Sequence, residues 1–243
     1  MKAAVLCEQP GDLIIEELVI DKPAPQEVLI QTVGAGLCHS DLHFMEGLFR
    51  TKLPSVMGHE SAGIVQAVGA DVSYVKPGDA VVACLSIFCG QCRQCLSGNP
   101  HRCTNGRATS RNRDDASRLQ REDGTPVDQM ARLGGFAEEM LVHQNGVVKV
   151  TPDIPLEKAC LIGCGVTTGF GAAVRTAAVP VGATVCVIGC GGIGLSAIQG
   201  ARVAGAGRII AVDMNTESLE TARVMGATDT INAGDVENVV EAV

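Results

Sequence analysis

The sequence predicts an α/β chain in two parts, a β-rich part followed by a βαβ part. Residues 2–150 hold many short apolar runs separated by Gly, Pro and Asp turns, which is the pattern of a β-sandwich or barrel. After Cys164 the pattern changes to an apolar strand, a glycine-rich helical stretch and a second apolar strand, which together make a βαβ unit. With 243 residues, the chain is long enough for two modest domains.

The expected strands of the first part follow its apolar runs, which are AAVL, LIIEEL, EVLIQTVG, AGIVQAVG, DAVVAC and EMLVHQNGVVKV. Between Thr104 and Gly135 the chain turns polar and charge-rich, so we expect a long exposed loop, to which we assign no role. In the second part TVCVI is typical of a buried strand, RIIAVD of another, and TDTIN of a short third one. The segment TESLETARVMGA predicts a helix with Glu217 in its first turn and Gly226 past its end.

The composition argues against two kinds of partner. A formal net charge of −8 and an aromatic content of 2% are poorly suited to nucleic acid, which requires a basic surface or stacking rings. Glu8 and Pro10 interrupt the N-terminal apolar run too early for a signal-peptide core, so we expect a cytoplasmic protein. The uncharged stretch 176–201 is long enough to cross a bilayer, but Pro180 and several glycines interrupt it. We therefore expect a strand, a turn and a helix there and no membrane span.

Four cysteines are spaced closely enough to surround one ion without help from distant parts of the chain. They are Cys89, Cys92, Cys95 and Cys103, in the pattern CxxCxxCx7C. Four thiolates suit tetrahedral zinc, and such a closed site would hold a loop in place instead of binding substrate. The bacterial ferredoxin pattern is similar, but its fourth cysteine follows after three residues and precedes proline. The spacing predicts structural zinc, with an iron–sulfur cluster or metal-free thiols as the alternatives.

Three further residues of metal-ligand type are dispersed along the chain: Cys38 in GLCHSDLH, His59 in GHE and Cys164 in GCG. Taken singly, a cysteine is more often a small buried hydrophobe than a ligand. A single histidine is likewise more often a hydrogen-bonded polar residue. Whether these three residues are metal ligands therefore has to be judged from their sequence neighbours.

A glycine-rich turn, GCGGIG, contains Gly189, Gly191, Gly192 and Gly194 directly after the strand TVCVI. Asp213 ends the next strand, 19 residues beyond Gly194. Glycines allow a tight turn and close approach to a pyrophosphate, and a carboxylate at that position can accept two ribose hydroxyls. The pattern predicts dinucleotide binding, with a merely tight turn as the alternative. Because Asp213 would repel a 2′-phosphate, NAD is favoured over NADP.

Together these motifs resemble the zinc-dependent medium-chain alcohol dehydrogenases. The stretches GLCHSDLH, GHE, the four cysteines, CLIGCGVTTGFGAAV and the glycine turn follow that family's order and approximate spacing from Lys2 to the last residue. The resemblance implies a GroES-like β-barrel catalytic domain over residues 1–165, with a zinc lobe at 89–103. It implies a partial NAD-binding Rossmann domain over residues 166–243. Because the chain ends at Val243, we expect about a hundred residues of the family's length to be missing.

The resemblance also implies how metal is held. Cys38, His59 and Cys164 would bind a catalytic zinc, and the four-cysteine group a structural zinc, which gives two Zn²⁺ per chain beside NAD. Glu60 resembles the carboxylate that can approach the catalytic zinc. Asp41 resembles the residue that orients His59, a role that imidazole ligands generally need filled.

Four more residues receive roles from the resemblance. Ser40 and His43 resemble the protein members of a relay that carries a proton from the alcohol to solvent. His39 resembles the residue that meets the cofactor pyrophosphate, and Thr168 one that packs near the nicotinamide. Cys164 favours the alcohol type over polyol relatives, which often have a carboxylate at that position.

The implied activity is hydride transfer between a small-molecule alcohol, or an aldehyde or ketone in reverse, and NAD. A glutathione-dependent formaldehyde dehydrogenase is one alternative, and a truncated, non-catalytic zinc-binding barrel is another. No nucleic acid or membrane partner is expected. Full-length members of the family would form homo-oligomers, which we do not expect of this chain.

Overall fold

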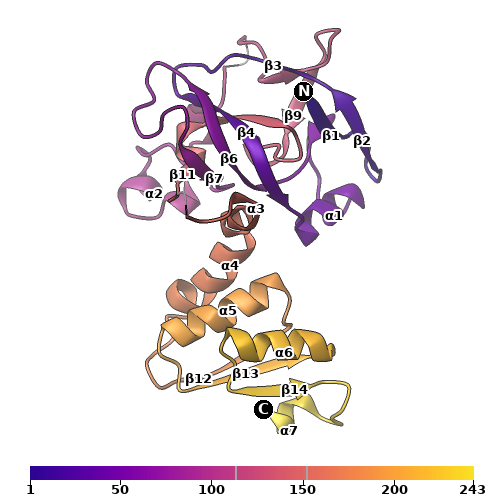
Figure 1. The fold of residues 1–243 in the computed structure, drawn as a ribbon, viewed down its shortest axis with the longest axis vertical. Coiled ribbons are helices and arrows are strands. Elements are labelled where there is room, and N and C mark those ends of the chain that lie inside the picture. Colours follow the sequence, from indigo (N-terminus) through magenta and orange to yellow (C-terminus); the bar gives the residue numbers. More distant parts are fainter. Residues whose placement is uncertain (113, 152) are drawn as a thin grey trace. The chain divides into compact units, whose positions relative to one another are not determined.

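The computed structural model describes residues 1–112, 114–151 and 153–243, which divide into two compact units, Met1–Gly163 and Cys164–Val243 (Figure 1). Each unit has its own buried apolar cluster. The first unit consists mainly of strands, and the second of parallel strands with helices. The predicted order, a β-rich part and then a βαβ part, is therefore confirmed.

The described strands of the first unit include at least one in every predicted apolar run and others outside those runs. In chain order these are β1 (Lys2–Leu6), β2 (Leu13–Glu17), β3 (Val19–Ile20), β4 (Glu27–Gly36), β5 (Ser55–Val56), β6 (Glu60–Val68), β7 (Ala80–Ala83), β8 (Leu119–Gln120), β9 (Pro126–Gln129), β10 (Glu139–His143) and β11 (Val147–Lys149). One sheet has the order β2-β1-β5-β9-β8-β3, and the other has the order β10-β4-β6-β7-β11.

Short helices lie between these strands and after the last of them. They are α1 (His39–Met45), α2 (Arg93–Leu96), α3 (Leu156–Ala159), and the 3₁₀ turns η1 (Pro100–Arg102), η2 (Gly106–Thr109), η3 (Met130–Arg132), η4 (Gln144–Gly146) and η5 (Cys160–Gly163). Alternate residues of β4, such as Val28 and Ile30, point into a core shared with Val65 of β6 and Met140 of β10. Each such fully buried side chain contributes about 1.5–3 kcal/mol to folding. This core fixes the strands whose ends carry the metal-ligand residues.

The predicted exposed loop, residues 104–135, is exposed over most of its described residues up to 117, but several residues from 118 onward are buried; residue 113 lies outside the described residues. The segment contains η2, β8, β9 and η3, and Leu119, Val127 and Leu133 are buried in apolar clusters. Two of its charged residues, Arg111 and Arg118, turn inward and pair with one carboxylate of β4. For the buried part of the segment the expectation was wrong, because a charge-rich sequence also suits buried ion pairs, which local composition does not reveal.

The second unit contains β12 (Thr184–Ile188), β13 (Arg208–Asp213) and β14 (Asp229–Asn232) as a parallel sheet in that order. Its helices are α4 (Gly165–Gly171), the π-helical η6 (Ala172–Thr176), α5 (Gly192–Val203), α6 (Thr216–Met225) and α7 (Val239–Ala242). Figure 1 shows α5 and α6 on the same side of the strands, where they pack on the sheet.

Helix α6 begins and ends as predicted. The side chain of Asn215 accepts the N–H groups of Glu217 and Ser218, and Gly226 follows the last turn with a φ of 124°. The interpretation of TVCVI as a buried strand is wrong, however. This strand, β12, lies at the sheet edge, and its outward residues include Ile188, which is 79% exposed. Among the described residues nothing covers that side chain.

The uncharged stretch 176–201 forms β12 and most of α5, as predicted. Within the described part of the chain, no single helix has the length and apolar composition needed to cross a membrane. One bent pair of shorter helices, Leu156–Gly163 and Gly165–Thr176, meets that test together, by length and composition only.

Glu27 is the buried carboxylate that anchors segment 104–135, and its replacement by Gln should cost about 3 kcal/mol of unfolding free energy. Its side chain is 4% exposed and accepts from Arg111 Nη2 and Arg118 Nε, both at 2.7 Å. The change leaves the buried Arg118 without a described counter-charge, and it leaves Arg111 with Asp21 alone. Urea unfolding of Glu27→Gln at pH 7 tests this expectation. In the matched control Glu16→Gln, the partly exposed pair with Arg121 should cost less than about 1 kcal/mol.

The effect of Glu27 should also depend on pH. Desolvation acts to raise the pKa of Glu27, but the hydrogen bond from Arg111 and the charge of Arg118 outweigh it, so the pKa lies below its ordinary value of 4.5. The stabilisation is therefore complete above pH 4.5 and is lost as the pH falls through the lower, folded-state pKa. A difference between wild type and Glu27→Gln that stays constant down to acidic pH would contradict this account.

Candidate functional site

Two of the dispersed ligand-type residues meet where β4 ends and β6 begins. The two strands are antiparallel neighbours, and Gly36 pairs with Glu60. Cys38 lies two residues beyond Gly36, and His59 lies one residue before Glu60, so the register brings residues from separate segments to one end of the sheet. A Cβ at position 36 would lie 2.5 Å from Oε2 of Glu60, so glycine at this position leaves room for the carboxylate.

The ligand atoms of Cys38, His59, Glu60 and Cys164 all lie within 4.8 Å of one another. Cys164 follows Gly163, the last residue of the first unit, by one peptide bond. His59 and Glu60 are buried, at 3% and 4% exposure. Two thiols, an imidazole and a carboxylate are a donor set suited to zinc, so the residues present fit that ion.

Asp41, in the first turn of α1, contacts two members of this group. Its Oδ1 lies 3.2 Å from Nδ1 of His59, and its Oδ2 accepts the backbone N–H of Cys38 at 3.0 Å. The carboxylate is itself buried. Because Nδ1 faces Asp41, Nε2 is the imidazole nitrogen that can coordinate a metal ion.

The surroundings of Cys38 favour its thiolate. Burial acts to raise the pKa of this thiol, but the backbone N–H and hydroxyl of Ser40 and the imidazole of His59 outweigh it, so the pKa is lowered. The thiolate is the form that binds metal.

Helix α1 also carries the other residues predicted near this group. Ser40 and His43 are half-buried, whereas His39 is exposed. The ring of His43 meets His39 edge-on at a centroid distance of 4.8 Å and Phe49 at 5.1 Å. One seven-residue helix thus presents Ser40, Asp41 and His43 directly after Cys38.

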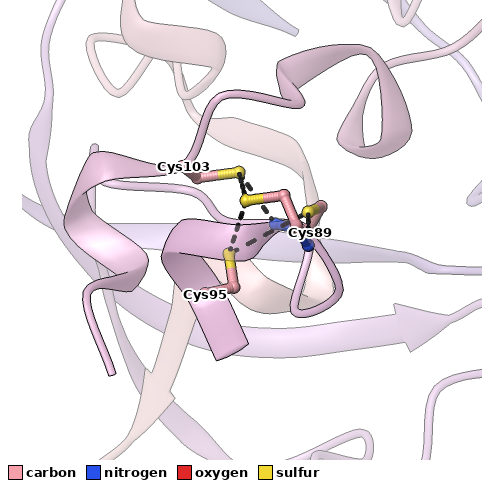
Figure 2. A group of neighbouring side chains, drawn as sticks. Cys89, Cys95 and Cys103 are labelled. Atoms are coloured by element: carbon pink, nitrogen blue, oxygen red, sulfur yellow. Dashed lines mark hydrogen bonds between the residues drawn. The ribbon is translucent and has the colours of Figure 1, made fainter. Parts of the chain in front are cut away.

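The four closely spaced cysteines form a compact cluster, which we call the cysteine lobe (residues 89–103). Figure 2 shows the sulfurs of Cys89, Cys95 and Cys103 pointing toward one another, with Cys95 on α2. Measured Sγ–Sγ distances are 3.4 Å for Cys92–Cys95 and 3.9 Å for Cys89–Cys95. Zinc–sulfur bonds of about 2.3 Å in a tetrahedron separate two sulfurs by about 3.8 Å, so the lobe fits zinc.

Backbone amides of the lobe point at its sulfurs. The N–H of Cys89 donates to Sγ of Cys103, and the N–H of Cys92 donates to Sγ of Cys89, each at 3.3 Å. Backbone N–H groups of Cys95 and Thr104 lower the pKa of Cys92 to about 5. Burial and the sulfur of Cys92 raise the pKa of Cys95 to about 11. The surroundings therefore favour the thiolate of Cys92 and disfavour that of Cys95. A cation bound among the sulfurs would stabilise all of the thiolates together.

The glycine turn after β12 is tight in one place and open in another. Gly189 has a φ of 90°, and a Cβ at Gly194 would lie 1.8 Å from the carbonyl oxygen of Gly189. A Cβ at Gly191 or Gly192 would meet no atom within 4 Å. The turn thus requires glycine at 189 and 194 for its own geometry, and leaves an open backbone at 191 and 192 that a pyrophosphate can approach.

Asp213, at the end of β13, faces this turn. Its Oδ2 accepts the N–H of Cys190 at 2.7 Å, and its Oδ1 accepts the N–H of Asn215 at 2.8 Å. These two backbone donors lower its pKa. An ionised carboxylate has about four acceptor sites, so two remain for ribose hydroxyls. Thr168 lies in α4, where its N–H donates to the carbonyl of Cys164 at 2.8 Å.

Arg132, which no sequence motif predicted as a functional residue, contacts both flanks of the cysteine lobe with its side chain. The only available signal was a charged residue between apolar neighbours, MARL, in a segment taken for a solvated loop. Such a signal does not specify what the side chain contacts.

Comparison with protein families finds two matches. The alcohol dehydrogenase GroES-like domain matches residues 24–153, and the zinc-binding dehydrogenase domain matches residues 192–243. S-(hydroxymethyl)glutathione dehydrogenase of Saccharomyces cerevisiae is 43% identical over 238 residues, which is 95% of this chain and 61% of that protein. The chain therefore spans less than two thirds of this relative's length.

Solved structures of zinc-binding and alcohol dehydrogenases are also similar to this chain. An alcohol dehydrogenase zinc-binding domain protein from Burkholderia ambifaria is 37% identical with a TM-score of 0.91. Benzyl alcohol dehydrogenase from Acinetobacter calcoaceticus is 35% identical with a TM-score of 0.86. Each match covers 99% of this chain and 66% of the other.

The GroES-like match alone covers more than half of the 243 residues, and the similarity to solved structures extends over nearly all of them. The expected fold, a GroES-like domain followed by a partial Rossmann domain, is confirmed. The chain belongs to the zinc-dependent medium-chain alcohol dehydrogenase family.

Proposed function

We propose that this chain carries the metal and dinucleotide sites of an NAD-dependent alcohol dehydrogenase, which transfers a hydride between an alcohol carbon and the nicotinamide ring. The observation that carries the proposal is the gathering of thiol, imidazole and carboxylate ligand atoms within 4.8 Å in a chain that also has an open glycine turn. We assign residues 1–165 to the catalytic domain and residues 166–243 to the dinucleotide-binding domain.

In this proposal Cys38, His59 and Cys164 hold the catalytic zinc, with Glu60 close enough to approach it. Zinc bound there supplies Lewis acidity, which lowers the pKa of an alcohol ligand. Two thiolates and a neutral imidazole offset the charge of the ion without filling a tetrahedral shell. Asp41 acts through His59, by fixing the ring so that Nε2 is the coordinating nitrogen.

Ser40 and His43 serve as the proton relay. A hydroxyl both donates and accepts, so Ser40 can receive a proton and pass it on. His43 lies three residues further along α1, hence on the same face of the helix as Ser40. The edge-on contacts with His39 and Phe49 restrict the ring of His43, which supports a fixed path for the proton.

The glycine turn and Asp213 hold the dinucleotide, and NAD supplies the hydride acceptor when bound. Gly191 and Gly192 allow the pyrophosphate to approach the start of α5, where backbone N–H groups point outward. Asp213 accepts the ribose hydroxyls and disfavours a 2′-phosphate, so we propose NAD over NADP. His39 and Thr168 are the further cofactor residues of this proposal.

The cysteine lobe holds a second, structural zinc through Cys89, Cys92, Cys95 and Cys103. Four sulfur ligands leave no position for a substrate. The lobe therefore acts on stability and not on the reaction itself.

A second candidate is oxidation of S-(hydroxymethyl)glutathione, because a dehydrogenase named for that substrate is 43% identical to this chain. This adduct is itself an alcohol, so the same zinc and dinucleotide sites would act on it. The two candidates differ only in the alcohol that is bound.

The zinc-loaded chain should form NADH from NAD and an alcohol, and should contain two zinc ions per chain. Absorbance at the NADH band, with simple alcohols compared against formaldehyde plus glutathione, tests the activity and separates the two candidates. Elemental analysis gives the zinc content. A full zinc complement with no NADH formed from any of these substrates would favour the non-catalytic zinc-binding barrel and contradict the proposed activity.

Asp41→Asn should weaken zinc binding at the Cys38–His59–Cys164 site by about 10–100-fold, the usual cost of losing a partner that orients a ligand. The amide cannot accept equally well from both His59 and the Cys38 backbone. Competition with a chromophoric chelator measures the affinity. Glu46→Gln, at the exposed end of the same helix, is the control and should leave the affinity unchanged.

Gly191→Ala and Gly194→Ala should separate cofactor binding from folding. Position 191 has an ordinary φ of −75° and space for a methyl group, so this variant should fold with wild-type stability but bind NADH at least about tenfold more weakly. Gly194→Ala should instead lose about 2 kcal/mol of unfolding free energy, because its methyl meets the Gly189 carbonyl. Urea unfolding and NADH fluorescence titration measure the two effects. Wild-type NADH affinity in Gly191→Ala would contradict the assigned pyrophosphate site.

A further inference from the structure

Arg132 is joined to both flanks of the cysteine lobe. Its Nη2 donates to the carbonyl of Ile87 at 3.2 Å, two residues before Cys89. Its Nη1 donates to the carbonyl of Gly106 at 3.3 Å and to Oγ1 of Thr109 at 2.5 Å, both just after Cys103. One planar guanidinium thus ties together the chain segments that enter and leave the lobe.

The backbone at Arg132 is unusual. Arg132 has a φ of 63° and its neighbour Ala131 a φ of 52°, so two consecutive non-glycine residues lie in the left-handed region. L-residues adopt this region at a cost in free energy, and it persists only where the surroundings hold it. Here the strained turn η3 directs the side chain of residue 132 back toward the lobe.

Arg132 also lacks the kind of partner that comparable arginines have. In the described part of the first unit, four arginines are not classed as exposed, and Arg111, Arg118 and Arg121 each pair with a carboxylate. Arg132 donates only to neutral acceptors, and no ion pair joins it to a described carboxylate. A half-buried cation of this kind needs a negative group nearby.

The cysteine lobe offers that negative group. Four thiolates around one Zn²⁺ carry a net charge of −2, from four negative and two positive charges. The pKa of Arg132 is lowered overall, by burial and by the like charge of Arg118, and the sulfur of Cys103 acts in the opposite direction.

We propose that Arg132 is a positioning residue for the zinc of the cysteine lobe. Its guanidinium hydrogen-bonds to both flanks of the lobe and supplies positive charge that partly balances the negative charge of the zinc tetrathiolate. This inference rests on the structural zinc of the proposed function, and it adds a residue that is neither a ligand nor part of the lobe.

The test is the rate at which the zinc-loaded full chain releases zinc to a chromophoric chelator. Zinc release is expected in two phases, one for each site. The variant Asp41→Asn should speed only the release from the Cys38–His59–Cys164 site, and this identifies its phase. Arg132→Met should speed the other phase, that of the lobe, about tenfold or more, because residues that support metal ligands have effects of that size. The Asp41-sensitive phase should remain unchanged.

Arg107→Met is the matched control. Arg107 is exposed and lies four residues after Cys103, but it is not joined to Ile87. Its loss should alter lobe release by less than about twofold. Arg132→Lys keeps the charge but lacks the planar guanidinium. It should therefore release zinc from the lobe faster than wild type but more slowly than Arg132→Met. If Arg132→Lys released zinc from the lobe as slowly as wild type, the proposed bridging of the two flanks by one guanidinium would be wrong.

If Arg132→Met fails to fold, Thr109→Val removes one of the same hydrogen bonds with little change in volume and should speed lobe release several-fold. Wild-type lobe release in Arg132→Met, or in Thr109→Val where Arg132→Met does not fold, overturns the role of Arg132 while leaving the structural zinc intact. Wild-type protein with no zinc in the lobe overturns the structural zinc itself, so the two failures are distinguishable.

Discussion

The antiparallel register of β4 and β6 is the constraint on which the proposed catalytic site depends. Because Gly36 pairs with Glu60, the residues just outside the two strand ends, Cys38 and His59, become neighbours. A slip of one residue would turn every side chain of one strand to the opposite face. The buried residues of β4 and β6 prevent such a slip, since it would expose Val28 and its core partners. Hydrophobic packing within the sheet thus determines where Cys38 and His59 lie.

Glycines, which have no side chain, also shape the metal-ligand group and the glycine turn. Gly36 makes room for the Glu60 carboxylate, and Gly194 makes room for the carbonyl of its own turn. Gly191 differs, because no atom of the described residues lies within 4 Å of a Cβ built there. Glycine at the first two positions is therefore explained by the fold, whereas the open backbone at Gly191 is what the approach of a pyrophosphate requires. This distinction supports a ligand at the turn more strongly than the GxGxxG spacing does by itself.

Much of this architecture could be predicted from the sequence, and the failures share a physical cause. Strand positions, the limits of α6 and the four-cysteine lobe follow from local patterns, because periodicity, capping and short ligand spacing act over a few residues. The exposed face of β12 and the inward turn of Arg118 depend on what lies across the fold. Local composition predicts neither, since an apolar strand can lie at a sheet edge and an arginine can be buried beside a carboxylate. Residues far apart in sequence, such as Cys38 and Cys164, required the family resemblance.

Arginine side chains compensate for a chain with few aromatic residues. The whole chain has five Phe, one Tyr and no Trp, so few large rings are present to hold the long connections of the first unit in place. Segment 104–135 is instead anchored by Arg118 on Glu27, and the lobe is joined to the same unit by Arg132. A guanidinium can bind several acceptors in one plane, so a single side chain can fix two chain segments at once. In the Glu27 pairs the counter-charge is a carboxylate. At Arg132 the described residues provide no carboxylate partner, and in our proposal the zinc-bound cysteine group supplies the negative charge, so the stability of the lobe and the burial of that cation would depend on each other.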